Sequence, residues 1–422
     1  MSTRRVVITG LGAVTPVGND APSTWDALVA GRSGVGPITT FDAETFPVKI
    51  AGTVKGFDLD DRLPDHRLTR RFSRAGGFGV AAGLEALEDA ALGPDDYEPE
   101  ERGISMGAGV GRPDLGELVE MSYTIKSSDG HVLALQAPSS VLLRDQNVPV
   151  KSLALLGGFE GPTVSVSTAC SASCHAVGEA LRRIQEADAK LMLAGGYDAL
   201  TTWFDVIGFG LLGALTKDHE DEPERASRPF DKERSGFVVG EGSAAMVLEE
   251  LESAQARGAH IYAELVGYGS SMNAYRMTDP PPDGGGVTLA MQNTLDDAGA
   301  EPTEVDFVVA HGTSTPGNDI CETTAIKQVF GDHAYALAIS SPKSMTGHRT
   351  CAAGALNVLV AARAIQDGVV PPTINYENPD PKLDLDYVPN EARKLNADSV
   401  LVNSFAFGGT NACLLLRRLE GS

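Results

Sequence analysis

The sequence contains no apolar run long enough to cross a bilayer. The helix-like stretch 354–365 is well short of the roughly 20 residues that a membrane span needs, and it contains Arg363. The first residues lead straight into a strand-like segment, without the apolar core of a secretory signal. These absences predict a cytoplasmic protein that has no membrane partner.

Cysteine is scarce and unclustered. The chain has 422 residues and five cysteines, with no C-x-x-C pair and no Cys/His group at zinc-binding spacing. In a large chain without an export signal, this pattern predicts reduced thiols, and we expect no metal site. The five are Cys170, Cys174, Cys321, Cys351 and Cys413.

Positive charge is also in short supply. Lys and Arg number 34 against 57 Asp and Glu, a formal net charge of −23, which argues against a nucleic-acid partner. An acidic protein partner would need a local basic patch. The densest basic cluster is the candidate patch, and an ordinary solvated helix face is its alternative interpretation. The cluster comprises Arg62, Arg67, Arg70, Arg71 and Arg74.

Cys170 lies where a strand-like segment meets a helix-like one. Val164 and Val166 alternate with hydroxylated neighbours before it, as in a half-buried strand. Apolar side chains recur at helical spacing after it, at positions 174, 177, 181 and 184. A thiol at a helix N-terminus is favoured as thiolate, so Cys170 is a candidate nucleophile; a small buried core residue is the alternative.

Two of the eight histidines stand at junctions between a regular element and a loop, where reactive side chains tend to project. His311 ends an apolar strand-like run, and His348 follows a Gly-containing turn before a helix-like stretch. The other six are interpreted as structural. One Cys combined with two such His residues suggests acyl transfer through a thioester.

Five motifs in this order resemble the β-ketoacyl-acyl-carrier-protein synthases. The likeness is greatest to synthase II of fatty acid synthesis and to the catalytic ketosynthase of type II polyketide systems, and it runs from residue 6 to about 416. The motifs are STACSAS around Cys170, RPFDKERSGFVVGEG from Arg228, AHGTST from Ala310, KSMTGH from Lys343 and NSFAFGGTN from Asn403.

The resemblance implies an α/β thiolase-type fold, in which duplicated α/β halves form five layers, αβαβα. An internal repeat agrees with this: helix-like 78–92 precedes strand-like 103–107, and 287–298 precedes 305–310. We take 400–404 as the counterpart of the strand before Cys170. The expected halves are residues 1–255, carrying the Cys, and residues 256–422, carrying the two His.

The resemblance also implies the reaction. Cys170 would accept an acyl group from a carrier, with the N–H groups of Cys170 and Phe407 as the oxyanion hole. Malonyl-carrier would then lose carbon dioxide, and neutral His311 and His348 would donate hydrogen bonds to the enolate. The enolate would attack the Cys170 thioester. No cofactor is expected, because the phosphopantetheine arrives on the acyl carrier protein.

Supporting residues are carried over in the same way. Lys343 and Glu322 match the family's buried ion pair, which would support the His348 loop. Thr313 and Thr315 match hydroxyls that contact the pantetheine arm, and Asn411 matches a residue that positions a loop.

The resemblance further places a gate and an acyl pocket around the thiol. Phe405 and Phe407 match the gating loop, while Val110 and Phe209 would form walls of the acyl pocket. Arg67, Arg70 and Arg71 would be the docking site for the carrier.

Several positions depart from the family pattern. Gly213 stands where synthase II has a carrier-contacting Arg, and Ala406 replaces a Gly of the gate. Arg349 brings a charge near the acyl pocket, Asn357 replaces a Glu, and Val110 replaces a bulkier Ile. A specialised acyl chain, such as a polyketide or polyene, would account for these together; drift within a fatty-acid synthase II is the alternative.

Three other functions match parts of the sequence. Residues 7–15 resemble a dinucleotide-binding loop, but the last Gly is replaced and the acidic partner is missing. A thiolase would use coenzyme A and a second Cys, and Cys413 is better interpreted as core.

A chain-length factor would lack Cys170, so this chain should be the catalytic member of a homodimer or of a heterodimer with such a homologue, with residues 121–158 in the interface.

Overall fold

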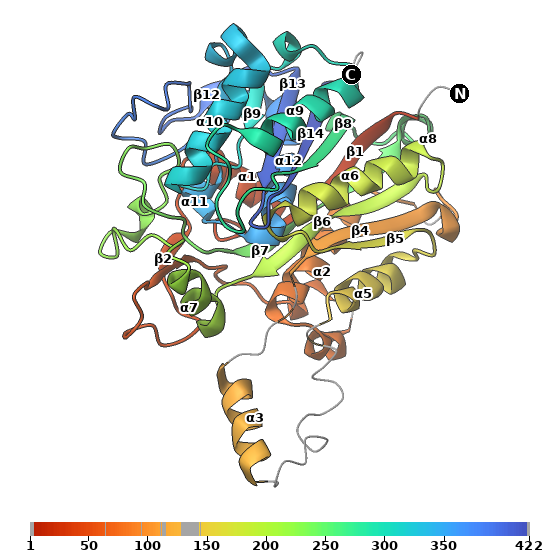
Figure 1. Cartoon of the computed structure of the whole chain (residues 1–422). Coiled ribbons are helices and arrows are strands. Elements are labelled where there is room, and N and C mark those ends of the chain that lie inside the picture. Colours follow the sequence, from red (N-terminus) through yellow and green to blue (C-terminus); the bar gives the residue numbers. More distant parts are fainter. Residues whose placement is uncertain are drawn as a thin grey trace.

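A computed structural model of the chain describes residues 4–63, 65–93, 95–109, 111, 115–127, 143 and 145–419 (Figure 1). Within these residues, no helix combines the length and the apolar character needed to cross a membrane.

A ten-stranded sheet made of two similar halves organises the fold. The strand order is β10-β9-β13-β14-β8-β1-β7-β6-β4-β5, and the halves meet where β1 pairs with β8 over only three residue pairs. The N-terminal half contains β1 (Val6–Val14), β4 (Arg102–Ala108), β5 (Thr163–Val166), β6 (Leu191–Ala199) and β7 (Glu241–Glu250). The C-terminal half contains β8 (Ala263–Met272), β9 (Phe307–Val309), β10 (Ala338–Ser340), β13 (Ser399–Phe405) and β14 (Thr410–Arg417).

The two halves repeat one topology. Starting from the junction, the N-terminal strands run β1-β7-β6-β4-β5 and the C-terminal strands run β8-β14-β13-β9-β10. In each half the two outermost pairings are parallel and the two next to the junction are antiparallel. This is the duplicated α/β arrangement that the sequence predicted.

Helices complete five layers around the two halves of the sheet. The helices α2 (Arg74–Asp89) and α5 (Asn147–Gly157) cover the outer face of the N-terminal half, and α9 (Gly285–Ala298) and α10 (Pro316–Phe330) cover that of the C-terminal half. Between the halves lie α6 (Ala172–Gln185) and α12 (Ala353–Asp367), which contact strands of both. The αβαβα order is therefore confirmed.

Hydrophobic patterning explains which helix takes which layer. Nearly every residue of α12 is buried, including Leu356, Leu359 and Ile365, as expected for a helix enclosed on all sides. The outer helix α2 buries one face and leaves acidic residues such as Glu88 and Asp89 at the other. The sequence therefore distinguishes a middle helix from a covering one.

The topology corrects one predicted correspondence. The strand before Cys170 is β5, an outermost strand, and its counterpart by position is β10, not the residues 400–404 of β13. β13 corresponds to β6 instead. The turns before α6 and α12 are also alike: each is a 3-10 turn that starts at a residue with positive φ, Ala169 at 49° and Thr350 at 38°, although α11 (Lys343–Thr346) lies between β10 and the second turn. The turn before α6 is thus repeated before α12.

The remaining elements lie around this body. The helix α3 lies apart from the other elements in Figure 1, and part of the predicted interface region 121–158 falls outside the described residues. These elements are α1 (Ala21–Val29), β2 (Val35–Pro37), β3 (Ile50–Gly52), α3 (Leu115–Ser127), α7 (Trp203–Leu211), α8 (Leu251–Ala256), α11 (Lys343–Thr346), β11 (Val369–Val370) and β12 (Arg393–Lys394).

Glycines allow the start of α6 to lie against its neighbours. A Cβ atom on Gly107 of β4 would stand 2.4 Å from the backbone of Ala172 and Ser173. A Cβ on Gly196 of β6 would stand 2.6 Å from Cβ of Ser173, and one on Gly354 of α12 2.9 Å from Cys174. The first turn of α6, which directly follows Cys170, is therefore packed without room for a methyl group.

We expect Gly107→Ala to destabilise the protein by about 1–3 kcal/mol, because α6 has to move away from β4. Thermal denaturation should show a lower Tm. Gly208→Ala is the matched control: Gly208 is exposed in α7 with open space around it, and Ala there should raise stability by roughly 0.5–1 kcal/mol. Equal stability of the two variants would contradict this packing argument.

Candidate active site

Cys170 is held in a fixed turn at the start of α6. It lies in the 3-10 turn Ala169–Ser171, is 6% exposed, and follows Ala169 with its positive φ. The Ser404 hydroxyl at the end of β13 donates a 2.9 Å hydrogen bond to the Cys170 carbonyl. The C-terminal half therefore fixes the backbone that carries the thiol.

His348 reaches the same region from the turn before α12. Its N–H donates to the Val238 carbonyl at 2.7 Å, and its carbonyl accepts from Gly240 at 2.9 Å. Its ring Nδ1 accepts from the Thr350 N–H at 3.3 Å. Because Nδ1 accepts a hydrogen bond, the proton of the neutral ring lies on Nε2, which leaves that nitrogen free to donate.

His311 follows β9 and is held through its backbone. Its N–H donates to the Glu322 carboxylate at 2.8 Å, and Lys343 Nζ donates to its carbonyl at 2.5 Å. Glu322 also accepts from Gly312 at 2.8 Å and from Asn403 at 3.0 Å. These contacts fix the path of the chain on both sides of the imidazole.

The predicted ion pair between Lys343 and Glu322 is corrected by these contacts. In the described part of the chain, the two side chains form no ion pair within 4.0 Å. Each instead binds the main chain at His311, on opposite sides of that residue. Glu322 still acts on Lys343 over a longer distance, because its charge raises the pKa of the Lys343 ammonium group against the effect of burial. Both side chains support the main chain at His311.

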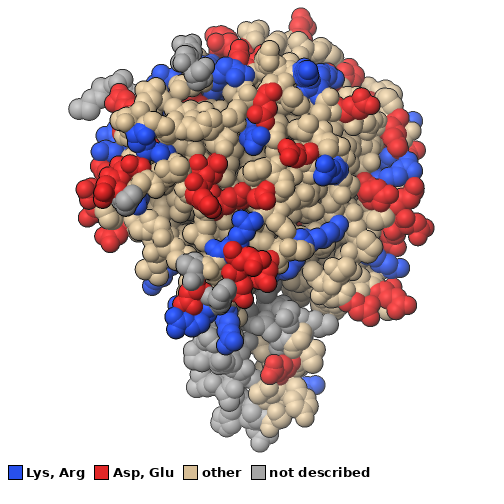
Figure 2. Space-filling view, turned by 180° about the vertical axis from the view of Figure 1, so that it is seen from behind, with Lys and Arg blue, Asp and Glu red and all other residues tan. Residues whose placement is uncertain are grey.

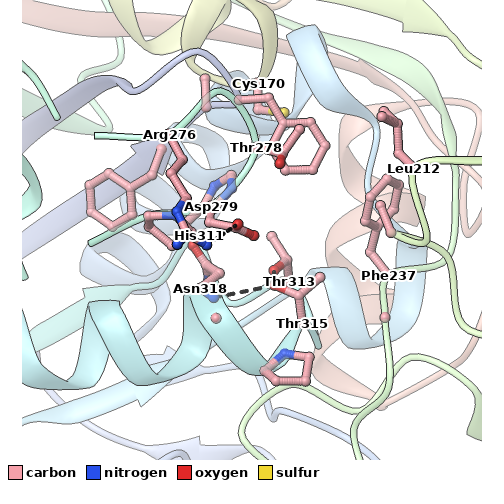
Figure 3. A pocket seen from close by; sticks show the side chains of 18 of the residues that line it. Cys170, Leu212, Phe237, Arg276, Thr278, Asp279, His311, Thr313, Thr315 and Asn318 are labelled. Atoms are coloured by element: carbon pink, nitrogen blue, oxygen red, sulfur yellow. Dashed lines mark hydrogen bonds and ion pairs between the residues drawn. The ribbon is translucent and has the colours of Figure 1, made fainter. Parts of the chain in front are cut away.

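One cavity of about 310 Å³ collects the three reactive side chains. Cys170, His311 and His348 line it together with Phe405 and Phe407, and in Figure 3 Cys170 and His311 face the same space. The two imidazole rings meet edge to face, with centroids 5.3 Å apart. Residues from both halves of the chain therefore share one small space.

The outer part of this cavity carries hydroxyl groups. Thr313 and Thr315 line it, and their hydroxyl oxygens are 2.8 Å apart. Asn318, Arg276 and Met277 also line the cavity, and Figure 3 shows Asn318 and Arg276 around the same space as Thr313 and Thr315. The cavity therefore offers polar contacts along a route to Cys170.

The loop 405–409 closes one side of the cavity. The Gly408 N–H donates to the Met277 carbonyl at 2.7 Å, and Gly408 and Gly409 both have positive φ. Ala406 does not, so its Cβ causes no strain in this conformation. The Phe407 main chain lies close enough to Cys170 to lower the pKa of its thiol, and its N–H is the group predicted to contribute to the oxyanion hole.

Burial sets the protonation of the three groups. It lowers the pKa of both His311 and His348 well below the ordinary value, so both rings are neutral at pH 7. It also raises the pKa of Cys170 to about 11, against the opposing effects of the Phe407 N–H and the Lys343 charge. Desolvation is the largest effect on this pKa, and it favours the protonated thiol, whereas the helix terminus predicted from the sequence favours the thiolate.

Some predicted residues do not reach this cavity. Among the described residues that line it, neither Phe209 nor Asn411 is present. Phe209 packs against Phe237, with ring centroids 5.5 Å apart, and Phe237 lines the cavity instead. Asn411 holds the Gly409 carbonyl at 3.3 Å, which is a loop-positioning contact. Val110 lies outside the described residues.

The basic cluster is partly engaged within the molecule. Arg74 forms an ion pair with the buried Glu241 at 2.5 Å, and Arg67 pairs with its neighbour Asp65 at 2.7 Å. Arg70 and Arg71 are exposed on the 3-10 turn His66–Arg71, and no residue of this turn lines the Cys170 cavity. On the face shown in Figure 2, acidic and basic side chains are interspersed rather than gathered in one basic surface.

Two contributors were missed from the sequence. Phe237 lies 5.3 Å from His348, ring edge to face, and belongs to the motif that begins at Arg228, which was the available signal. Asp198 is buried at the end of β6 and accepts hydrogen bonds from the Thr350 hydroxyl and the Cys351 N–H. No local pattern marks Asp198, because its role depends on contact with the other half.

Two further predictions concern residues outside this centre. Cys413 is fully buried on β14 and its thiol contacts the Asn403 side chain at 3.3 Å, so it belongs to the core as predicted. In the described ranges, no group of three or more His, Cys, Asp or Glu side chains could hold a metal ion.

Comparison with known proteins identifies the family. Residues 3–254 match the beta-ketoacyl synthase N-terminal domain, and residues 262–377 match the beta-ketoacyl synthase C-terminal domain. The chain is 46% identical to the 3-oxoacyl-[acyl-carrier-protein] synthase 2 of Coxiella burnetii, over 99% of this chain and 100% of that protein.

Solved structures agree with this assignment. The ishigamide ketosynthase/chain length factor matches with a TM-score of 0.90 and 36% identity, over 99% of this chain and 100% of that one. A type II PKS acyl-carrier protein in complex with its ketosynthase bound to the hexaketide matches with a TM-score of 0.88 and 33% identity, over 99% and 100%. The chain belongs to the β-ketoacyl synthase family.

Proposed function

We propose that Cys170, His311 and His348 catalyse the decarboxylative Claisen condensation of malonyl-carrier with an acyl group held on Cys170. β-Ketoacyl-[acyl-carrier-protein] synthase activity, an acyltransferase reaction, follows from the family, whose members use an active-site cysteine and no free cofactor. The single observation that carries the residue roles is the cavity in which one thiol and two neutral imidazoles meet.

The first step is acyl transfer to Cys170. The sulfur attacks the carbonyl carbon of the acyl-carrier thioester, and the old C–S bond breaks. The thiol proton passes to the departing pantetheine sulfur, so the step is neutral overall. The N–H groups of Cys170 and Phe407 would stabilise the tetrahedral oxyanion, each by roughly 3 kcal/mol.

The second step is loss of carbon dioxide from malonyl-carrier. The bond between the carboxylate and the methylene carbon breaks, and its electron pair becomes the enolate. His311 and His348 would donate hydrogen bonds to the enolate oxygen. The hydrogen bond from Thr350 to Nδ1 of His348 supports this role, because it directs the Nε2 proton of His348 to the cavity.

The last step forms the carbon–carbon bond. The enolate carbon attacks the Cys170 thioester, the C–S bond breaks, and the sulfur takes up one proton. The product is a β-ketoacyl carrier two carbons longer. We also propose that residues 1–255 and 256–422 are the halves that contribute the thiol and the two imidazoles, respectively.

The partner would be an acyl carrier protein. Its phosphopantetheine arm would extend past Thr313 and Thr315, whose hydroxyls line the cavity on the way to Cys170. Arg67, Arg70 and Arg71 remain the proposed docking residues; of these, Arg70 and Arg71 are exposed without an internal ion pair in the described part of the chain.

We also propose a dimer, with a second copy or with a chain-length-factor homologue. Among the described strands, β5 pairs only with β4, so its other edge is available to a partner strand. β5 directly precedes Cys170, which would place the partner beside the thiol. The solved relative that combines a ketosynthase with a chain length factor supports the heterodimer.

We propose that the chain acts as the ketosynthase of a type II polyketide pathway. Polyenes are among the products that such a pathway would give. Two solved relatives of polyketide type support this, as do the polar side chains of Arg349 and Thr350 in place of apolar ones beside the cavity. The second candidate is fatty-acid elongation, which the name of the Coxiella burnetii relative favours.

Cys170→Ala should abolish covalent loading because it removes the nucleophile, while decarboxylation of malonyl-carrier persists. Intact-protein mass spectrometry with acyl-carriers measures the first, and carbon dioxide release measures the second. Cys174→Ala, which changes a buried thiol four residues away, is the control and should load normally. Acyl mass on the Cys170→Ala protein would overturn the assignment of the nucleophile.

His311→Ala and His348→Ala should each slow decarboxylation by about 10²–10³-fold, because one donor to the enolate is lost. Loading of Cys170 should continue, so the two half-reactions are measured separately. His260→Ala is the control, since His260 is exposed, contacts Gln366 and Tyr262, and does not line the cavity. Full decarboxylation by both active-site variants would falsify the enolate assignment.

The pathway is tested by competition between carriers. Equal amounts of saturated and of unsaturated or keto-bearing acyl-carriers of one chain length are mixed with the protein, and the mass added to Cys170 is followed. A polyketide or polyene enzyme should load the modified chain several-fold faster. Preference for the saturated chain would favour fatty-acid elongation instead.

A further inference from the structure

Arg349 is a buried cation for which the described part of the chain supplies no partner. Its side chain is among the largest that are fully buried, with 1% exposure. Its Nε and Nη1 atoms have no hydrogen-bond partner, and no carboxylate lies within 4.0 Å of the guanidinium. Burying an unpaired charge costs stability, so its retention requires an explanation.

The other fully enclosed arginines show the contrast. Arg228 lies 2.7 Å from the Glu377 carboxylate and 3.7 Å from that of Asp231. Arg234 lies 2.9 Å from Asp380 and 3.7 Å from Asp319. In this molecule a buried guanidinium is therefore ordinarily accompanied by acids, and Arg349 is the exception among these three.

The nearby buried acids are already engaged elsewhere. Asp198 accepts from the Thr350 hydroxyl and from the Cys351 and Ala199 N–H groups. Glu241 binds Arg74 and the Thr201 hydroxyl. Glu322 binds the main chain at His311. Each carboxylate is satisfied without Arg349, so none of them neutralises it.

Arg349 is also close to the reactive groups. It directly follows His348 in the chain. Its Cγ packs beside Gly240, 3.1 Å from the position that a Cβ there would occupy, and the main chain of residues 238–240 bonds to His348. Burial lowers the pKa of Arg349 to about 9, which still leaves it charged at pH 7. Its charge contributes to the lowered pKa of both His348 and Lys343.

We propose that Arg349 is a positioning residue of the condensation, which acts through space by keeping an uncompensated positive charge beside His348 for the negative charge that forms on the substrate. This inference rests on the proposed function. Arg349 does not line the Cys170 cavity, so it would not touch the substrate. The anion that Arg349 would stabilise is the enolate, which forms only during the reaction. The electron pair of the breaking bond to carbon dioxide then moves onto the enolate oxygen at His311 and His348.

Low local polarity makes such a charge effective at a distance. Between unit charges in a protein interior, the interaction falls slowly with separation and exceeds its value in water several-fold. The charged and titratable groups that face His348 are Lys343 from α11, His311 and Cys170 across the cavity, and Asp198 beyond Thr350. Of these, Lys343 has the same sign as Arg349 and Asp198 the opposite sign, but Asp198 forms no ion pair with the Arg349 guanidinium within 4.0 Å.

The test replaces Arg349 by Met, which keeps an unbranched chain, and by Lys, which keeps the charge. Arg349→Met should slow decarboxylation of malonyl-carrier by roughly 10- to 100-fold through kcat, with little change in KM or in loading of Cys170. Arg349→Lys should recover most of the rate. Arg363→Met, an exchange at a partly exposed arginine of α12 paired with Asp367, is the control and should leave both half-reactions unchanged.

Stability provides a second, opposite readout. Because an unpaired charge is removed from the interior, Arg349→Met should raise the Tm while it lowers the rate. Titration of the imidazoles by NMR should show the pKa of His348 rising in the Met variant. A merely structural arginine would give a lower Tm and no such shift.

Three results would overturn the inference. The first is an unchanged decarboxylation rate in Arg349→Met. The second is a loss of both half-reactions with a lower Tm that Lys does not restore, which would mean a structural role. The third is an altered choice of acyl chain at the loading step alone, which would make Arg349 a ligand of the chain. A wild-type protein that releases no carbon dioxide would instead overturn the proposed function, and this inference with it.

Discussion

The position of two buried helix starts decides the rest of the structure. The helices α6 and α12 lie between the two halves of the sheet, and the turns that precede them are in contact. Each turn begins with a residue at positive φ, Ala169 in one and Thr350 in the other. Because the same turn–helix unit occurs in both halves, the contact between the two turns brings Cys170 and His348 to one place. Glycine at positions such as 107 and 354 permits the contact.

Removal of these groups from water then determines their chemistry. A solvated histidine would be partly protonated near neutral pH, whereas His311 and His348 are kept neutral by burial. The same burial keeps the proton on Cys170. In the proposed mechanism, nucleophilic attack depends on arrival of the thioester, whose carbonyl would receive the N–H groups and whose leaving sulfur would accept the proton. Burial thus protects the thiol until a substrate is present.

The sequence predicted what depends on local pattern. Periodicity placed Cys170 at a strand–helix junction and His311 at the end of a strand, and both positions are confirmed. The predicted correspondence between the strand before Cys170 and residues 400–404 was wrong, because the sequence of a short apolar strand does not indicate its position in a sheet. The predicted ion pair between Lys343 and Glu322 is not formed within 4.0 Å, because both side chains bind peptide groups at His311. Side-chain identity alone does not indicate a main-chain partner.

Contacts between distant segments account for what was missed. Asp198 meets Thr350 only because β6 and the turn before α12 pack together, and no motif links them. Phe237 was not singled out from the sequence, yet it lines the cavity and packs against Phe209, the ring predicted as a wall of the acyl pocket. A family resemblance indicates which segments approach each other. It does not decide which of two adjacent rings faces inward.

The surface and the centre differ in how their charges are arranged. The chain carries a net charge of −23, and the buried groups near the imidazoles include the cations Lys343 and Arg349 together with the carboxyl groups of Glu322, Asp319 and Asp198. Salt screens the surface field beyond a Debye length of about 8 Å, but it screens a buried charge much less. A malonyl group is therefore attracted only after it has entered the cavity. Entry has to be driven by binding of the carrier at the surface, so selection of the carrier and stabilisation of the enolate depend on separate parts of the molecule.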